Sequence, residues 1–232
     1  MRRRYDQYCA MARTLDVVGE RWTLLIVREL LTGPKRFKDL AEALPGIGTG
    51  LLAARLKLLE TEGLACKARL LPPANTEAYD LTEAGEELGP AVLALTRWGL
   101  KWAFGERRAG EAFRPGWAVL ELQALFQPDA AAELDLVYEW RIGESIFHAH
   151  VHHGQIDSSY GPGQRPDAVI EASEDVFSEV AAGRISLRRA AADGRATVRG
   201  DAAAVGALRS LFALPDRRVG AASLPDLEAA AS

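Results

Sequence analysis

The sequence predicts an α+β protein with two domains, the first mainly helical and the second built on an antiparallel sheet. Three observations support this prediction. Apolar residues recur at helical spacing in the first part of the chain, alternating strand patterns dominate the last part, and the charged, Gly-containing stretch GERRAGEAFRPG lies between them. We therefore expect a first domain at 1–104, a linker at 105–116, a second domain at 117–220 and a tail at 221–232.

Two helices are predicted early in the first domain. The segment WTLLIVRELL at 22–31 has apolar residues around the whole helix, which predicts burial on two sides, and Gly33-Pro34 ends it. The segment KRFKDLAEAL at 35–44 places its apolar residues on one face, which is typical of a short amphipathic helix.

A third helix is predicted within GIGTGLLAARLKLLETEGL at 46–64, and its solvent face is unusually bare. Its buried stripe consists of Leu52, Leu56 and Leu59. The residues on the opposite face are Gly50, Ala53, Ala54, Lys57 and Thr61. Long charged side chains favour solubility on a solvent-facing surface. A face of glycine and alanine therefore indicates that another surface approaches this helix closely.

A hairpin and a long helix complete the first domain. The segments LACKARLL at 64–71 and EAYDL at 77–81 are predicted to be strands around a turn rich in Pro and Asn. A hairpin that directly follows a helix-turn-helix is a wing, so the first domain is predicted to be a winged helix-turn-helix. The long helix at 82–104 carries Trp98 and Trp102 on one side, where they need a partner surface.

The second domain begins with a predicted helix at 117–126, followed by alternating patterns. Strands are predicted at 134–142, 145–153 and 155–161, joined by tight turns. The remaining predicted elements are a strand at 167–173, a helix from Ser173 to Gly183, a short helix at 186–194, an edge strand at 195–201 and a helix at 202–214.

Charge is distributed unevenly along the chain of 232 residues, whose net charge is −4. Residues 1–71 hold 13 Lys and Arg against 8 Asp and Glu, whereas the rest of the chain holds 15 against 24. A polyanionic partner is therefore expected to dock on the first domain.

Several classes of protein lack support in the sequence. Cys9 and Cys66 are not spaced as a disulfide framework or a zinc cluster. No apolar run reaches membrane-spanning length, so we expect a cytoplasmic protein that does not engage a membrane. No catalytic triad order, phosphate loop or metal motif occurs in its required context. We expect no enzyme, no cofactor, and no catalytic or metal-binding residues.

Residues 5–104 resemble the HxlR family of bacterial winged-helix transcriptional regulators. The resemblance is carried by YCAMARTLDVVGERW and the helical segments that follow it, by YDLTEAGEEL, and by the Trp98-Gly99 pair. It implies binding of operator DNA by a homodimer. Some members of the family sense oxidants or electrophiles through an N-terminal cysteine, and Cys9 occupies the place of that cysteine. The alternative for Cys9 is an inert, small apolar residue.

The resemblance offers a reason for the bare helix face, because small residues admit the helix backbone deep into a major groove. The residues expected to bind DNA are Lys35, Arg36, Lys38, Thr49, Gly50, Ala53, Arg55, Lys57, Lys67 and Arg69. For Arg55 the alternative is a structural brace, and for the other basic residues it is an ordinary solvated charge. The bare face itself has the alternative of packing against a protein helix.

Two departures from the family pattern concern specificity. Members commonly carry a lysine or another polar residue where Gly50 stands, and an arginine in the wing, where this chain has PPANTEAY. We therefore expect little direct reading of bases and modest specificity at each half-site. For dimerisation we expect Leu95, Trp98 and Trp102 together with the helix at 22–31, and the alternative is a core helix covered by the second domain.

Residues 117–214 are similar to the SCP2, or sterol-carrier, fold. The similarity lies in the hairpins of DLVYEWRI and SIFHAHVHHGQI, in DAVIEASEDVFSEVAAGRI, and in RAAADGRATVRGD with its closing helix. It implies an α/β domain with an apolar tunnel that holds lipid-like molecules. The residues available to bind such a ligand are Phe147, Val151, Ile170, Phe177, Leu187, Leu208 and Phe212. Each of them is also an ordinary core residue.

The run FHAHVHHG alternates histidine with apolar residues, so His148, His150 and His152 share one face of a strand about 7 Å apart. A metal site there needs a further ligand from another strand, and none is evident. We expect these histidines to face solvent, the first domain or a partner subunit, where they can make a contact sensitive to pH.

These observations favour a dimeric DNA-binding regulator whose SCP2-like domain binds an apolar effector that changes operator affinity. One alternative makes Cys9 the sensor and the second domain an oligomerisation module. Another alternative is an apolar-ligand carrier whose winged domain contacts proteins.

Overall fold

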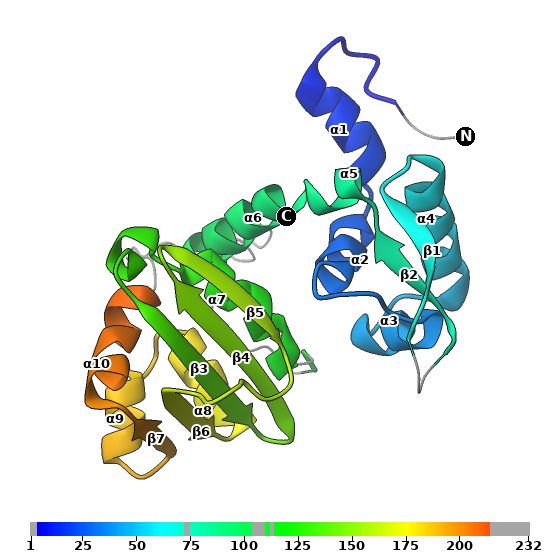
Figure 1. Ribbon diagram of the computed structural model, residues 1–232. Helices are drawn as coiled ribbons and strands as arrows, with labels where there is room; N and C mark the ends of the chain where they lie inside the picture. The colour runs from blue at the N-terminus through cyan, green and yellow to red at the C-terminus, as the bar shows by residue number, and fades with distance from the viewer. Residues whose placement is uncertain (1–3, 72–74, 104–109, 112–113, 214–232) are drawn as a thin grey trace, which may run out of the picture. The chain divides into compact units, whose positions relative to one another are not determined.

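The computed structural model describes residues 4–71, 75–103, 110–111 and 114–213 (Figure 1). The chain divides into two compact units, residues 1–92 and residues 93–232, and each is described by itself. The division falls ahead of the expected linker at 105–116, much of which lies outside the described residues. The expected tail at 221–232 also lies outside them. The expected domain bounds therefore remain a prediction.

The N-terminal unit is a helix-turn-helix with a wing, as the sequence predicts. Its two strands pair antiparallel, and β1 packs against α4 while β2 packs against α2 (Figure 1). The elements of this unit are α1 (Ala10–Val18), α2 (Thr23–Leu30), α3 (Phe37–Ala43), α4 (Thr49–Thr61), β1 (Ala65–Arg69), β2 (Glu77–Leu81) and α5 (Glu83–Glu86).

The core of this unit forms where the apolar stripes of α2, α3 and α4 meet. Ile26, Leu40 and Leu52 have no exposed surface. The expectation that the helix at 22–31 is buried on two sides is only partly correct. Leu24 packs against the core, but Leu25, about 100° further around the helix, is 40% exposed.

The C-terminal unit is a five-stranded sheet in the order β5-β4-β3-β6-β7, with helices packed on one face (Figure 1). The helix α6 (Gly89–Trp102) contains the division between the two units. The other elements are α7 (Ala118–Leu125), β3 (Asp135–Ile142), β4 (Ser145–His152), β5 (Gln155–Tyr160), β6 (Ala168–Ala172), α8 (Glu174–Ala181), α9 (Leu187–Ala192), β7 (Ala196–Gly200) and α10 (Ala202–Leu211), with short 3-10 turns at Pro115–Trp117 and Pro128–Ala131.

The antiparallel sheet and its edge strand β7 agree with the sequence prediction, except that one pair of neighbouring strands is parallel. β3 pairs parallel with β6, whereas the other neighbours pair antiparallel. The loop at 161–167 carries the chain from β5 to the far side of β3, and this crossover sets the parallel direction. The turn at His153-Gly154 has positive φ at both residues, as a tight two-residue hairpin requires.

Alternation along the strands separates an apolar face from a polar one. Tyr138, Trp140 and Phe147 point to the apolar face and are buried with residues of α7 and α10. The histidines of β4 lie on the opposite face. In the described part of the chain, none of the helices combines the length and the apolar character needed to cross a membrane.

Candidate nucleic-acid interface and C-terminal core

The bare face of α4 is solvent-facing in the N-terminal unit. Thr49, Gly50, Ala53 and Lys57 are exposed, while the leucine stripe on the other side of the helix is fully buried. A methyl group built on Gly50 would meet no atom within 4 Å. This face is therefore open to a close approach by another molecule.

The basic residues around this face differ in how strongly they are paired. The side chain of Lys57 has no hydrogen bond or ion pair among the described residues, and the ammonium of exposed Lys38 lies 3.5 Å from Glu42 Oε1. Arg36 pairs with Asp39 at 2.7 Å, and this guanidinium hydrogen bond holds the pKa of the Asp39 carboxyl below its usual value. Lys57 and Lys38 are thus the residues most available to phosphate.

The wing is held by backbone hydrogen bonds to the chain just before α3. The Lys35 amide donates to the Tyr79 carbonyl at 2.9 Å, and the Tyr79 amide donates back to the Lys35 carbonyl at 2.8 Å. On the wing, Lys67 pairs with Glu77 and its ammonium lies 4.9 Å from the Tyr79 ring centroid, and Arg69 donates to Asn75 Oδ1 at 2.8 Å. Residues 72–74 of the wing turn lie outside the described part.

Lys35 is half-buried, unlike its basic neighbours. Its ammonium donates to Thr32 Oγ1 at 2.7 Å, and burial lowers its pKa. Its backbone anchors the wing, so the structure gives Lys35 a local structural role beside the expected contact with DNA.

Arg55 lies at the flank of the buried stripe, and its Nη2 donates to Glu20 Oε2 at 2.9 Å. Its side chain is only 20% exposed, against 49% for Glu20. The geometry matches the alternative of a structural brace. Sequence reasoning missed Glu20 because its partner is 35 residues away, beyond the reach of any periodicity.

The expected dimerisation residues form an exposed stripe on α6. Leu95, Trp98 and Trp102 are 55%, 50% and 37% exposed. A methyl group built on Gly99, next to Trp98, would meet no atom within 4 Å. Solvent-exposed tryptophans at helical spacing are unusual on a surface without a partner.

Cys9 is the N-cap residue of α1 and is exposed, and its side chain makes no capping hydrogen bond. The backbone N–H groups of Ala12 and Met11, in the first turn of α1, lower the pKa of its thiol. Cys66 is an exposed free cysteine on β1.

The seven residues expected to bind an apolar ligand belong to one cluster in the C-terminal unit. Phe147, Val151 and Ile170 are fully buried on the sheet. Aromatic rings make many of the contacts, such as Phe147 with Phe177 at 6.0 Å between centroids. The other four of the seven come from the helices and their ends and are partly buried, namely Phe177, Leu187, Leu208 and Phe212.

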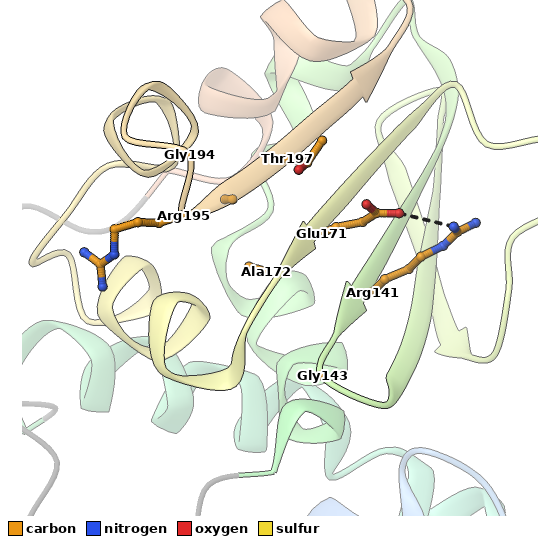
Figure 2. Close-up of a pocket in the computed structure, with 8 residues that line it drawn as sticks. Arg141, Gly143, Glu171, Ala172, Gly194, Arg195 and Thr197 are labelled. Carbon is orange, nitrogen blue, oxygen red and sulfur yellow. Dashed lines mark hydrogen bonds and ion pairs between the residues drawn. The ribbon is translucent and has the colours of Figure 1, made fainter.

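A separate open pocket of about 380 Å³ lies at the ends of β3 and β6 and the start of β7 (Figure 2). Its lining mixes charged and polar side chains with glycine and alanine, and none of the seven apolar residues contributes to it. Arg141 and Glu171 are neighbours on β3 and β6 and pair at 3.2 Å, whereas the Arg195 guanidinium points away from them and pairs with Glu179 at 2.8 Å (Figure 2). This pocket is therefore not the expected apolar site.

Two of the three histidines on the polar face of the sheet contact carboxylates of neighbouring strands, and His148 Nδ1 lies 3.0 Å from the Gly161 carbonyl oxygen. His150 Nε2 lies 2.6 Å from Asp135 Oδ1, and His152 Nε2 lies 2.8 Å from Asp157 Oδ2. The rings of His150 and His152 lean together to 4.7 Å, so the expected spacing of about 7 Å is wrong for this pair. No group of three or more His, Cys, Asp or Glu in the described residues is arranged to hold a metal ion.

Two family models match the chain in succession. The HxlR-like helix-turn-helix model covers residues 17–107, and the model of the SCP-2 sterol transfer family covers residues 120–213.

Relatives match the N-terminal part. An HTH-type transcriptional regulator of Mycobacterium tuberculosis is 42% identical over 90 residues, which cover 39% of this chain and 56% of that protein. The chain thus spans little more than half the length of this relative. YvaP, an HTH-type transcriptional regulator of Bacillus subtilis, is 37% identical over 92 residues, covering 39% of this chain and 83% of YvaP.

Among solved structures, the reduced form of the transcriptional regulator YodB from Bacillus subtilis is 33% identical, with coverage of 40% of this chain and 92% of YodB and a TM-score of 0.35. Because YvaP is matched over most of its length, and because both family models agree with the fold described above, the chain belongs to the HxlR-like helix-turn-helix family and carries an SCP2 domain after its helix-turn-helix domain.

Proposed function

We propose that this regulator binds its operator as a homodimer by placing the bare face of α4 in the major groove. The observation that carries the proposal is the exposed surface of Gly50, Ala53 and Lys57, opposite a fully buried leucine stripe. A B-DNA major groove admits a helix, and small side chains let the helix backbone come close to the base edges. The anchored wing supplies a second contact to the DNA backbone.

Phosphate contacts carry most of the affinity in this proposal. Exposed Lys57 contacts phosphate directly, and Lys38, Arg36, Lys67 and Arg69 do so after exchanging their partners within the chain for phosphate. Glycine and alanine at the groove read few bases, so specificity depends on the pairing of two half-sites.

The homodimer is proposed to form through the stripe of Leu95, Trp98 and Trp102. Their exposure supports this assignment, because burial of large aromatic side chains dominates the energetics of interfaces. Two copies of the chain related by a two-fold axis would present two α4 helices to an inverted repeat.

The SCP2 domain is proposed to bind an apolar effector between its sheet and its helices. The partly buried Phe177, Leu187, Leu208 and Phe212 support this site, because they cover the sheet without being fully enclosed. The effector is proposed to favour one of two relative arrangements of the winged domains in the dimer. It changes operator affinity only as far as its own affinities for these two arrangements differ. The proposal assigns no catalytic step to the chain.

The test is a mobility shift with the purified protein and the DNA upstream of its own gene, at several salt concentrations. Lys57→Ala should weaken binding and reduce the slope of log Kobs against log salt by about 1 for each phosphate that the lysine neutralises. Arg188→Ala removes an exposed charge from α9 and is the matched control. Binding that neither prefers the upstream DNA nor responds to Lys57→Ala would refute the proposal and favour an apolar-ligand carrier.

A second candidate function is the sensing of oxidants or electrophiles through Cys9. It is favoured by the exposed thiol and by the nearby backbone N–H groups that lower its pKa, because thiolate is the reactive form. The C-terminal domain then serves oligomerisation. Loss of DNA binding on treatment with hydrogen peroxide, abolished by Cys9→Ser and unchanged by Cys66→Ser, would support this candidate over an apolar effector.

A further inference from the structure

The ion pair between Arg55 and Glu20 joins two elements that are far apart in the sequence. Arg55 belongs to α4, and Glu20 lies in the connection between α1, which ends at Val18, and α2, which begins at Thr23. The bond between Arg55 Nη2 and Glu20 Oε2 is 2.9 Å long. It therefore fixes the middle of α4 to the connection just before α2.

The environment of Arg55 is poorly suited to contact with DNA. Its side chain is 20% exposed, and its guanidinium is already engaged with a carboxylate. Lys57, two positions along the same helix, is exposed and unpaired among the described residues. The exposed face of α4 thus presents Lys57 and turns Arg55 to the flank.

The pairing of Arg55 is also incomplete, which argues against a role in stability alone. Arg55 Nε is buried and has no hydrogen-bond partner within the described part of the chain. A buried donor without a partner is unfavourable, and an apolar residue of similar size would avoid that cost. The ion pair constrains the orientation of α4 relative to Glu20, since a guanidinium binds a carboxylate in a defined geometry.

We propose that Arg55 is a positioning residue for DNA binding, which holds α4 at the rotation that aims its bare face at the groove by pairing with Glu20. This inference rests on the proposed function, because it assumes that α4 enters the groove. It assigns to Glu20, an acidic residue, a role that favours the binding of a polyanion. It also replaces the expectation that Arg55 itself contacts DNA.

The sign of the effect at Glu20 separates this proposal from simple electrostatics. Removing a negative charge near DNA strengthens binding through Coulomb attraction alone. Under the proposal, Glu20→Gln instead weakens operator binding, by about fivefold, the size of a typical coupling between paired residues. Arg55→Gln weakens binding by a similar factor, and the double variant binds no more weakly than the weaker single variant.

The experiment measures operator affinity of the full chain by mobility shift across salt concentrations, well below the unfolding temperature of every variant. The slope of log Kobs against log salt should stay unchanged in Glu20→Gln and Arg55→Gln, because neither side chain neutralises a phosphate under the proposal. The exchanged pair, Glu20→Arg with Arg55→Glu, should recover part of the affinity that Arg55→Glu alone removes.

Three results would overturn the inference. One is tighter or unchanged binding in Glu20→Gln, and another is a slope reduced by about 1 in Arg55→Gln, which would make Arg55 a phosphate-binding residue. The third is additive losses of affinity in the double variant. Lys57→Ala distinguishes a failure of the proposed function from a failure of this inference. If Lys57→Ala does not weaken binding, the placement of α4 in the groove is contradicted, whereas the three results above contradict only the positioning role of Arg55.

Discussion

Substituting Gly50 by glutamate should stabilise the fold and weaken DNA binding, two effects of opposite sign from one change. A side chain at this position meets no atom within 4 Å, and the residue lies in the first turn of α4. Glutamate has a better helix propensity than glycine and interacts favourably with the helix N-terminus, which together are worth about 0.5–1 kcal/mol. The melting temperature should therefore rise by about 2–8 °C.

The fall in DNA affinity follows from placing a carboxylate against phosphates. Two like charges about 4 Å apart repel by about 1 kcal/mol in bulk water, which is about fivefold in affinity. A homodimer inserts two α4 helices, so affinity should fall by about 25-fold, the product of two such factors. Thermal denaturation followed by circular dichroism and a mobility shift on the upstream DNA measure the two effects.

Gly206→Glu is the matched control, because Gly206 lies on α10 of the C-terminal unit and is equally free of neighbours within 4 Å. It adds the same charge and the same gain in helix propensity, and it should leave DNA affinity unchanged. Equal DNA affinities for Gly50→Glu and Gly206→Glu would refute the groove assignment. A fall in melting temperature for Gly50→Glu would instead refute the openness of that position.

Three further changes test other parts of the molecule. Trp98→Glu should convert the proposed homodimer to a monomer in sedimentation velocity, because it places a charge in the exposed stripe that is proposed to be the interface. Glu139→Ala should lower the free energy of unfolding, measured by urea titration, by about 2 kcal/mol. The reason is that this fully buried carboxylate accepts a hydrogen bond from Arg141 Nε at 2.7 Å, and its removal leaves the half-exposed guanidinium without that acceptor. The hydrogen bond from His150 lowers the pKa of Asp135, so its contribution to stability is present above the unfolded pKa of about 3.9 and disappears as pH falls through the lower folded pKa. Asp135→Asn should remove that part of the acid-induced destabilisation. The measurement is the free energy of unfolding of the variant between about pH 5 and about pH 2, and a profile identical to that of the unsubstituted protein would contradict this reasoning.

Local pattern in the sequence determined the elements and their faces. The leucine spacing of α4 placed Leu52, Leu56 and Leu59 inside and left Gly50 and Lys57 outside, and the structure confirms both sides of the helix. The alternation in β4 likewise separated its buried residues from its histidines. Periods of 3.6 and 2 residues are properties of the backbone itself, so they can be read without knowing the tertiary structure.

Contacts between distant segments were decided only by the tertiary structure. The bonds of Arg55 to Glu20 and of Lys35 to Tyr79, and the parallel pairing of β3 with β6, join residues that no local period relates. Arg55 could be placed at the edge of a stripe from the sequence, but its choice between DNA and a carboxylate could not. The reason is that side-chain pairing depends on which surfaces the packed core brings together, and that arrangement is set by the whole chain.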